Sequence, residues 1–182
     1  DDFNISSANS LLKSLEEPKK NTFFILIAHQ ISSLLPTIRS RCVNYSIKKP
    51  NYEDFSQILL NNNSIPFSEI NLLYNVTNSS PGLAIEIYLN NIKDIFSNIL
   101  KIFTDNNSLS PNLINLVDEV GLYSNQDFKN FLILLRFIVL STLKIKLGYS
   151  YKDTLDSDII SNLSNIAKYI SNSTLLSILE FI

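Results

Sequence analysis

The sequence predicts a mostly α-helical chain whose first 49 residues form part of an α/β layer. Residues 1–49 show helix, strand, short helix and strand patterns in turn, an order typical of α/β layer structures. From Pro50 onward, apolar residues recur at helical spacing through several separate segments. One of them, residues 127–147, is apolar nearly all round, as is expected of the central helix of a bundle.

The N-terminal elements follow from local patterns. In SSANSLLKSLEEP, apolar residues at i, i+3, i+4 and i+7 from Ala8 predict a helix that Ser6 or Ser7 caps and Pro18 ends. The unbroken apolar run in NTFFILIAH predicts a strand that is covered on both faces. The next stretch regains helical spacing, with Pro36 tolerated in a first turn, and CVNYSIKK alternates as a second strand. Because two strands alone do not make a stable sheet of this type, the segment is expected to be the end of a larger domain.

The rest of the chain is predicted to form three short helices followed by five further helices. Asn51 and Ser80 are placed to cap two of the short helices, and Pro81 suits a first helical position. The expected helices cover residues 51–60, 68–77, 79–89, 92–104, 111–122, 127–147, 158–170 and 174–182.

Composition excludes several classes of protein. With 182 residues, of which 45% are hydrophobic and 18% charged, the chain is expected to bury a sizeable core. A net charge of −2 and a pI near 5.4 argue against a dedicated nucleic-acid binder. One cysteine and one histidine leave neither a disulfide framework nor a metal site. The start lacks a signal-peptide pattern and the longest apolar stretch is too short for a membrane span, so we expect a cytoplasmic protein without membrane contact.

The stretch LLPTIRSRC, residues 34–42, places two arginines shortly after the first expected strand. Arg41 stands between Ser40 and Cys42. A position that must reach a phosphate favours arginine, because its planar fork of donors binds oxyanions in a fixed geometry. On a helix, Arg39 and Arg41 would lie about 200° apart, so both cannot face the same phosphate.

These segments together resemble the clamp-loader family of AAA+ proteins, and most closely its delta-prime subunits of bacterial DNA polymerase III. Family members carry a helix close to A-N-x-L-L-K-x-L-E-E-P and, after an apolar strand, the triplet S-R-C. Ser40, Arg41 and Cys42 match the triplet. The motifs cover about the first 42 residues, and the remaining chain resembles the family only in predicted architecture. The helix motif is matched by Ala8, Asn9, Leu11, Leu12, Lys13, Leu15, Glu16, Glu17 and Pro18.

The resemblance implies a particular architecture and site. Residues 1–49 would be the end of an AAA+ base domain with two strands, residues 50–90 a three-helix lid, and residues 91–182 an all-α collar that holds a ring of subunits together. Arg41 would be an arginine finger that reaches the γ-phosphate of ATP–Mg bound by a neighbouring subunit. There it would neutralise charge that develops during phosphoryl transfer.

Several of these residues also have plainer interpretations. Without its motif, Arg41 would be a surface salt-bridge residue, and Arg39 is assigned to a solvated or interface role. His29 stands where active family members carry the sensor-1 polar residue, although a histidine that ends a strand is often only a polar cap. Cys42 is expected to be a buried small hydrophobe that opens the second strand. Lys13, with the glutamates one turn on, forms either a solvated helix face or a contact near subunit boundaries and the DNA chamber.

The segment NSSPGLAIEIY distinguishes the candidate subunit types. ATP-hydrolysing clamp-loader subunits resemble G-S-x-R-x-A-L here, with a sensor-2 arginine that touches nucleotide, and Gly82 stands at that position. The plainer interpretation is that Ser80 and Pro81 simply start a helix. No P-loop motif occurs in the sequence either. The resemblance therefore implies a subunit that binds no cofactor itself and is not catalytic alone.

The sequence thus favours a non-hydrolysing clamp-loader subunit of DNA polymerase III, the DNA-directed DNA polymerase of bacterial replication. The expected partners are the gamma/tau and delta subunits, with the sliding clamp contacted indirectly and primer–template DNA inside the assembled complex. Two alternatives stay open. One is an ATP-hydrolysing gamma/tau subunit, and the other is an unrelated helical protein-interaction module without nucleotide chemistry.

Overall fold

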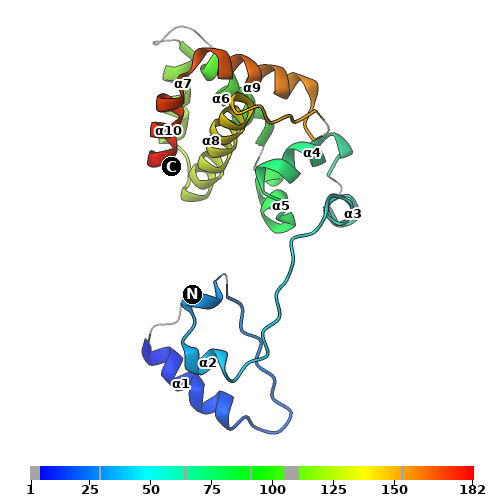
Figure 1. Cartoon of the computed structure of the whole chain (residues 1–182), viewed down its shortest axis with the longest axis vertical. Helices are drawn as coiled ribbons and strands as arrows, with labels where there is room; N and C mark the ends of the chain where they lie inside the picture. Colours follow the sequence, from blue (N-terminus) through cyan, green and yellow to red (C-terminus); the bar gives the residue numbers. More distant parts are fainter. Residues whose placement is uncertain (1–4, 29, 64, 91, 105–110, 153) are drawn as a thin grey trace. The chain divides into compact units, whose positions relative to one another are not determined.

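The described part of the chain is mostly helical and contains no strand, in agreement with the helical majority that the sequence predicts. The chain divides between Lys48 and Lys49 into two compact units, both drawn in Figure 1. The computed structural model describes residues 5–28, 30–63, 65–90, 92–104, 111–152 and 154–182.

The first unit, residues 1–48, is built on two helices that pack against each other. Its core is small, because Ile38 is the one buried hydrophobic residue among those described in this unit. Pro36 opens the second helix, as predicted, since its fixed φ suits a first helical position. The elements are α1 (Ile5–Glu16), the 3₁₀ turn η1 (Ile31–Ser33) and α2 (Pro36–Arg39).

The start of α1 differs from the prediction. The helix begins at Ile5, so Ser6 and Ser7 lie inside its first turn. A capping residue must stand outside the helical turn to accept the free backbone N–H groups, so neither serine can be the cap. The end agrees with the prediction, because Pro18 follows the last helical residue, Glu16, by two positions.

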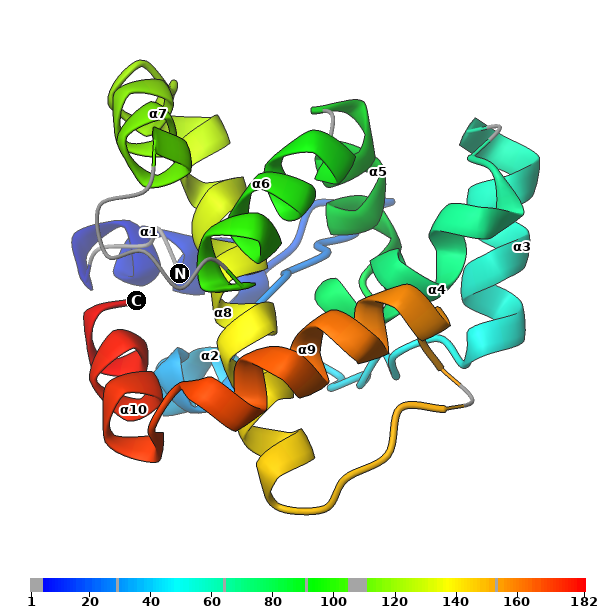
Figure 2. The same cartoon turned by 90° about the horizontal axis from the view of Figure 1, so that it is seen from above.

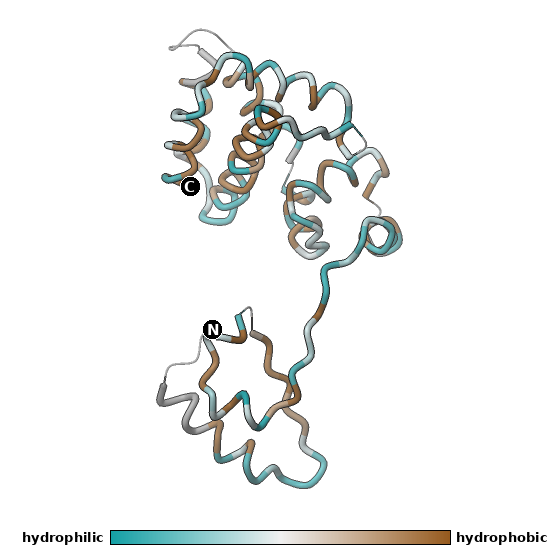
Figure 3. Tube along the Cα trace, viewed as in Figure 1, coloured by the Kyte–Doolittle hydropathy of each residue, from teal (hydrophilic) through white to brown (hydrophobic). Residues whose placement is uncertain are grey.

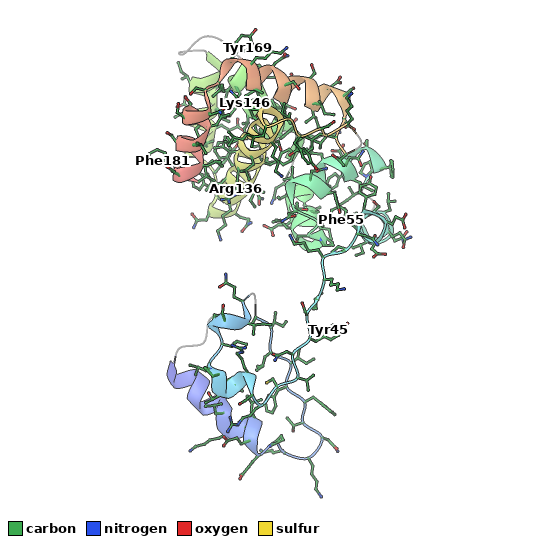
Figure 4. The ribbon with its side chains drawn as sticks, in the orientation of Figure 1. Tyr45, Phe55, Arg136, Lys146, Tyr169 and Phe181 are labelled. Carbon is green, nitrogen blue, oxygen red and sulfur yellow. The ribbon has the colours of Figure 1, made fainter. Side chains whose placement is uncertain are left out.

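The two expected strands are not confirmed. Residues 22–28 and 43–48 have neither helix nor strand pairing, and the first of these segments is drawn mostly in the hydrophobic colour in Figure 3. Ile25 is 88% exposed and Val43 is 99% exposed. A strand needs a neighbouring backbone to satisfy its N–H and C=O groups, and these segments find none among the described residues. Tyr45, labelled in Figure 4, likewise stays exposed.

The second unit, residues 49–182, contains the eight helices predicted after Pro50, each within a few residues of its expected bounds. The first three pack on one another, and they join the other five through contacts of α4 with α8 and of α5 with α6. The helices are α3 (Tyr52–Asn63), α4 (Phe67–Val76), α5 (Pro81–Leu89), α6 (Ile92–Thr104), α7 (Pro111–Gly121), α8 (Asn125–Lys146), α9 (Ser157–Tyr169) and α10 (Asn172–Phe181).

α8 is the central helix of this unit, as its apolar sequence predicts. It contacts α4, α6, α9 and α10, and Figure 2 shows α6, α9 and α10 arranged around it. Leu134 and Ile138 of α8 are fully buried within the main hydrophobic cluster. The cluster continues without a break into the three-helix group, where Phe55 is also fully buried (Figure 4). One core therefore joins α3, α4, α5 and α6 with α8 and α9.

In the second unit, local capping agrees with the sequence at one of the two expected positions. The backbone N–H of Asp54 donates to Asn51 Oδ1 at 2.8 Å, so Asn51 caps the start of α3 as predicted. Ser80 stands at the N-cap of α5 with Pro81 at the first helical position, but its side chain makes no capping hydrogen bond. Pro81 has no N–H, and α5 therefore begins through the fixed φ of proline.

One ion pair connects the three-helix group to the bundle. Glu69 of α4 is buried, and its carboxylate pairs with the ammonium of Lys93 on α6. The hydrogen bond to Glu69 and its negative charge raise the pKa of Lys93. Because the pKa is higher in the folded state, this contribution to stability is present below about pH 10 and is lost as the pH rises through the raised value.

Two polar side chains in α8 are buried without hydrogen-bond partners. Neither side-chain polar atom of Asn130 is paired, although the residue is 2% exposed, and the hydroxyl of Thr142 is also unpaired. An unpaired buried polar group costs about 1–3 kcal/mol. We expect Asn130→Leu to raise the free energy of unfolding by about 1–3 kcal/mol, and Thr142→Val by about 1 kcal/mol.

Urea denaturation followed by circular dichroism measures these changes. The matched control is Asn165→Leu on the exposed side of α9, which should alter the free energy of unfolding by no more than about 0.5 kcal/mol. A loss of stability in Asn130→Leu would contradict the prediction, since it would mean that the amide makes a favourable contact in solution.

Candidate functional site

Arg41 lies just beyond the C-terminal end of α2, in a tight turn. α2 ends at Arg39, Ser40 keeps helical backbone angles, and the N–H of Arg41 donates to the carbonyl of Ile38 at 3.1 Å. Proline at the start of α2 and the short length of the helix fix this turn. The side chain of Arg41 therefore projects from the end of a helix, where it is 36% exposed.

The guanidinium of Arg41 is held by two elements of the first unit. Its Nη2 lies 2.5 Å from Oε1 of Glu16, at the last residue of α1. Its Nη1 donates to the carbonyl of Thr37 at 2.9 Å and to Ser40 Oγ at 3.4 Å. This ion pair is the contact that the surface interpretation of Arg41 expects.

The ion pair also leaves Arg41 available for a stronger anion. Glu16 is 48% exposed, and exposed pairs of this kind contribute only about 0–1 kcal/mol. A phosphate offers the same fork geometry with more negative charge, and a water-excluded contact strengthens it further. The geometry thus suits a guanidinium that is positioned at a surface and that can exchange one oxyanion partner for another.

The helical argument that separates Arg39 from Arg41 needs correction. α2 ends at Arg39, so the angle of about 200° for residues of one helix does not apply to Arg41. Arg39 is exposed at the last position of α2, where a cation interacts favourably with the helix dipole. The two arginines differ instead in their surroundings, because Arg41 alone of the pair contacts Glu16.

The other predicted site residues are distributed as follows. Ser40 Oγ donates to the Thr37 carbonyl at 3.1 Å and thereby supports the turn that carries Arg41. Cys42 is a free thiol and is half-buried rather than fully buried, since no strand forms around it. Lys13 is exposed on α1, one turn before Glu16. His29 lies outside the described residues.

The position that would carry a sensor-2 arginine is open. Gly82 is the second residue of α5 and is exposed, and a Cβ placed there would meet no atom within 4 Å. Packing within this chain therefore does not require glycine, so the absence of arginine is not forced by the fold. Among the described residues, no group of histidine, cysteine and carboxylate side chains could hold a metal ion.

Sequence reasoning did not pair Glu16 with Arg41. It assigned Glu16 to a solvated helix face next to Lys13, while the structure makes it the partner of a side chain 25 positions further along. The one indication in the sequence that Glu16 and Arg41 are related is that both belong to the motifs matched to the family. Only the packing of α1 against α2 brings them together.

The described residues contain no helix that is both long and apolar enough to cross a membrane.

Comparison with known proteins finds relatives of the N-terminal segment. Residues 1–51 match the family described as "DNA polymerase III, delta subunit". The chain is 57% identical over 47 residues to DNA polymerase III subunit delta' of Pseudomonas aeruginosa, which covers 26% of this chain and 14% of the relative. No solved structure matches the chain.

Two further relatives extend the comparison. DNA polymerase III subunit delta' of Haemophilus influenzae is 40% identical over 81 residues, or 44% of this chain and 25% of the relative. The Bacillus subtilis subunit delta' is 55% identical over 42 residues, or 23% of this chain and 13% of the relative. The matched segments thus span a quarter or less of the length of these relatives.

Through its first 51 residues, the chain is therefore similar to subunits of DNA polymerase III. The relatives are delta' subunits of that polymerase, and the resemblance to delta-prime subunits that the sequence motifs predicted is confirmed.

Proposed function

We propose that this chain acts as a non-hydrolysing clamp-loader subunit of DNA polymerase III and that Arg41 is its trans-acting arginine finger. The observation that carries the proposal is the similarity of the N-terminal segment to the DNA polymerase III delta family over residues 1–51 and to delta' subunits. In this segment the Arg41 side chain is 36% exposed and forms an ion pair with a surface carboxylate, Glu16. In this role, Arg41 leaves Glu16 and contacts the γ-phosphate of ATP–Mg on a neighbouring subunit. A guanidinium there stabilises the charge of the transition state.

The proposed partners are the gamma/tau and delta subunits. Driven by their ATP, the complex would open the sliding clamp and load it on primer–template DNA. The division into base, lid and collar at residues 1–49, 50–90 and 91–182 is part of the same proposal, and the collar holds the subunit in the ring.

The uncovered apolar segments of the first unit support an AAA+ base domain. Phe23, Ile25 and Ile27 are exposed in one segment, and Val43 and Ile47 are exposed in the other. Each segment has strand-forming composition, and burying such side chains contributes about 1.5–3 kcal/mol apiece. In the proposed domain, both segments are strands of a parallel sheet that helices cover on both faces.

The alternative of an ATP-hydrolysing gamma/tau subunit is less favoured because Gly82 replaces the sensor arginine without any packing reason. We therefore expect the chain to bind ATP no better than an unrelated protein of similar size. Equilibrium binding of a fluorescent ATP analogue, with an unrelated helical protein as control, measures this. Saturable binding at micromolar concentration that unlabelled ATP displaces would contradict it.

Reconstitution tests the proposal directly. The purified chain is mixed with gamma/tau and delta subunits from the same cell, and complex formation is followed by gel filtration. We expect the chain to elute with these subunits. A chain that stays folded and helical by circular dichroism but elutes alone in every mixture would favour the unrelated helical interaction module instead.

A further inference from the structure

A cleft of about 510 Å³ lies in the second unit, away from the motifs of the first 51 residues. Its walls come from three places: the end of α4 with the turn that follows it, one side of α8, and the segment after α8 that contains Tyr149 and Tyr151. This volume is within the range of about 300–1,000 Å³ that is typical of ligand sites. The cleft can hold a short segment of another molecule.

The charged side chains that line the cleft are all positive. Arg136 and Lys144 contribute two positive charges, and no carboxylate occurs among the described residues that line it. Both cations are exposed, and Figure 4 shows Arg136 on α8. The ammonium of Lys144 lies 5.7 Å from the centre of the Tyr149 ring, a contact that leaves its hydrogen-bond donors available. The cleft is therefore complementary to an anionic ligand.

The spacing of these cations is regular. Arg136, Leu140 and Lys144 line the cleft at successive four-residue steps of one helix. Residues at this spacing share a face, and each step advances about 6 Å along the axis. α8 thus presents a cation, an apolar side chain and a second cation over about 12 Å. An elongated ligand with two acidic groups can therefore meet both cations while each side chain extends directly from the helix.

An extended peptide has the matching repeat. Its alternate side chains point to the same side and are about 6.6 Å apart, since each residue advances about 3.3 Å. An acidic residue, an apolar residue and a second acidic residue at alternate positions would therefore meet the three α8 side chains in turn. A nucleic-acid strand fits less well, because the chain has a net charge of −2 and lacks the basic field that such binding requires.

The opposite wall is polar and conformationally constrained. Asn78 and Ser79 both have positive φ, at 52° and 65°, which is uncommon for residues other than glycine. The N–H of Ser79 donates to the Tyr74 carbonyl at 3.0 Å and holds this turn. Asn78 is exposed and lines the cleft, so its amide can both donate to and accept from a peptide backbone.

We propose that this cleft binds an extended acidic segment of a partner protein. Carboxylates four positions apart in that segment pair with Arg136 and Lys144, and the apolar side chain between them packs on Leu140. The site is independent of Arg41, because it lies on the second unit and uses no residue of the first.

The test uses the full chain and a fluorescein-labelled peptide in which glutamate, leucine and glutamate alternate with serines. Fluorescence anisotropy should show saturable binding that weakens at least tenfold in Arg136→Glu and in Lys144→Glu. Both substitutions are at exposed positions, and circular dichroism confirms that the helices persist. The matched control, Lys168→Glu on the exposed side of α9, makes the same charge change outside the cleft and should leave the affinity unchanged.

Three results would overturn the proposal. The first is the absence of saturable binding. The second is equal affinity for a peptide of the same composition with its two glutamates adjacent, which would show attraction by charge without register. The third is that the chain binds an oligothymidylate but not the peptide, and that Arg136→Glu abolishes this binding. Such a result would make the cleft a nucleic-acid site.

Discussion

Arg41→Ala is expected to lower ATP hydrolysis at one site of the assembled clamp loader by about a thousandfold, which is the lower end of the range for arginine fingers. The affected site belongs to the neighbouring subunit, so total hydrolysis falls only partly while other sites keep their own fingers. Folding and assembly should persist, because the Arg41 side chain is 36% exposed and its pair with Glu16 is a surface contact. Arg41→Lys should restore little of the lost hydrolysis rate, since an ammonium cannot reproduce the planar fork of a guanidinium.

Two control variants separate the finger from the surface ion pair. Glu16→Gln removes the charge that holds Arg41, and it should retain most of the hydrolysis rate because the guanidinium remains. Arg39→Ala removes the neighbouring arginine and should also have little effect. The measurement is DNA- and clamp-stimulated hydrolysis by reconstituted complexes, each with one substitution, after gel filtration has confirmed assembly.

The pattern of losses decides the assignment. If Glu16→Gln reproduces the loss seen in Arg41→Ala, the ion pair itself is what matters and Arg41 is a structural residue. If Arg39→Ala rings fail to hydrolyse while Arg41→Ala rings are normal, the finger is the other arginine. If none of the three changes the rate, the trans-acting role is wrong for this protein.

Replacing Ile114 and Val117 together by serine is expected to weaken association with the gamma/tau and delta subunits by about a hundredfold or more. These side chains stand one turn apart on α7 and are 53% and 62% exposed. We expect this exposed apolar pair in the proposed collar to form part of the ring contact, where burying each side chain would contribute about 1.5–3 kcal/mol. Serine has a helix propensity similar to that of isoleucine and valine, so α7 should persist.

The control for α7 is Leu89→Ser. Leu89 ends α5 and is 73% exposed, but it lies in the proposed lid. This variant should bind the gamma/tau and delta subunits with the affinity of the unchanged chain. The affinity is measured by titration in gel filtration or by binding to partner subunits immobilised on a surface. If the α7 double variant binds with unchanged affinity, the ring contact lies on another surface of the second unit.

The helices of the second unit could be predicted well because their information is local. The apolar spacing, the cap at Asn51 and the proline at Pro81 each act within one turn, and all eight helices formed near their expected bounds. The central place of α8 was also predictable, because a helix that is apolar nearly all round must be covered on most sides. The family resemblance was predictable for a different reason, since the motifs of the first 42 residues have fixed spacing.

What the sequence by itself determined was therefore the set of helices, the family resemblance and the choice of Arg41 as the residue to test. The tertiary structure alone decided which partners these residues have. It paired Arg41 with Glu16 across 25 positions, left Asn130 unpaired inside the core, and placed Arg136 and Lys144 on one cleft. It also left residues 22–28 and 43–48 without strand pairing. The physical reason is common to all of these: helical spacing is a property of neighbouring residues, whereas ion pairs, buried polar groups and sheets depend on which distant backbone the fold brings alongside.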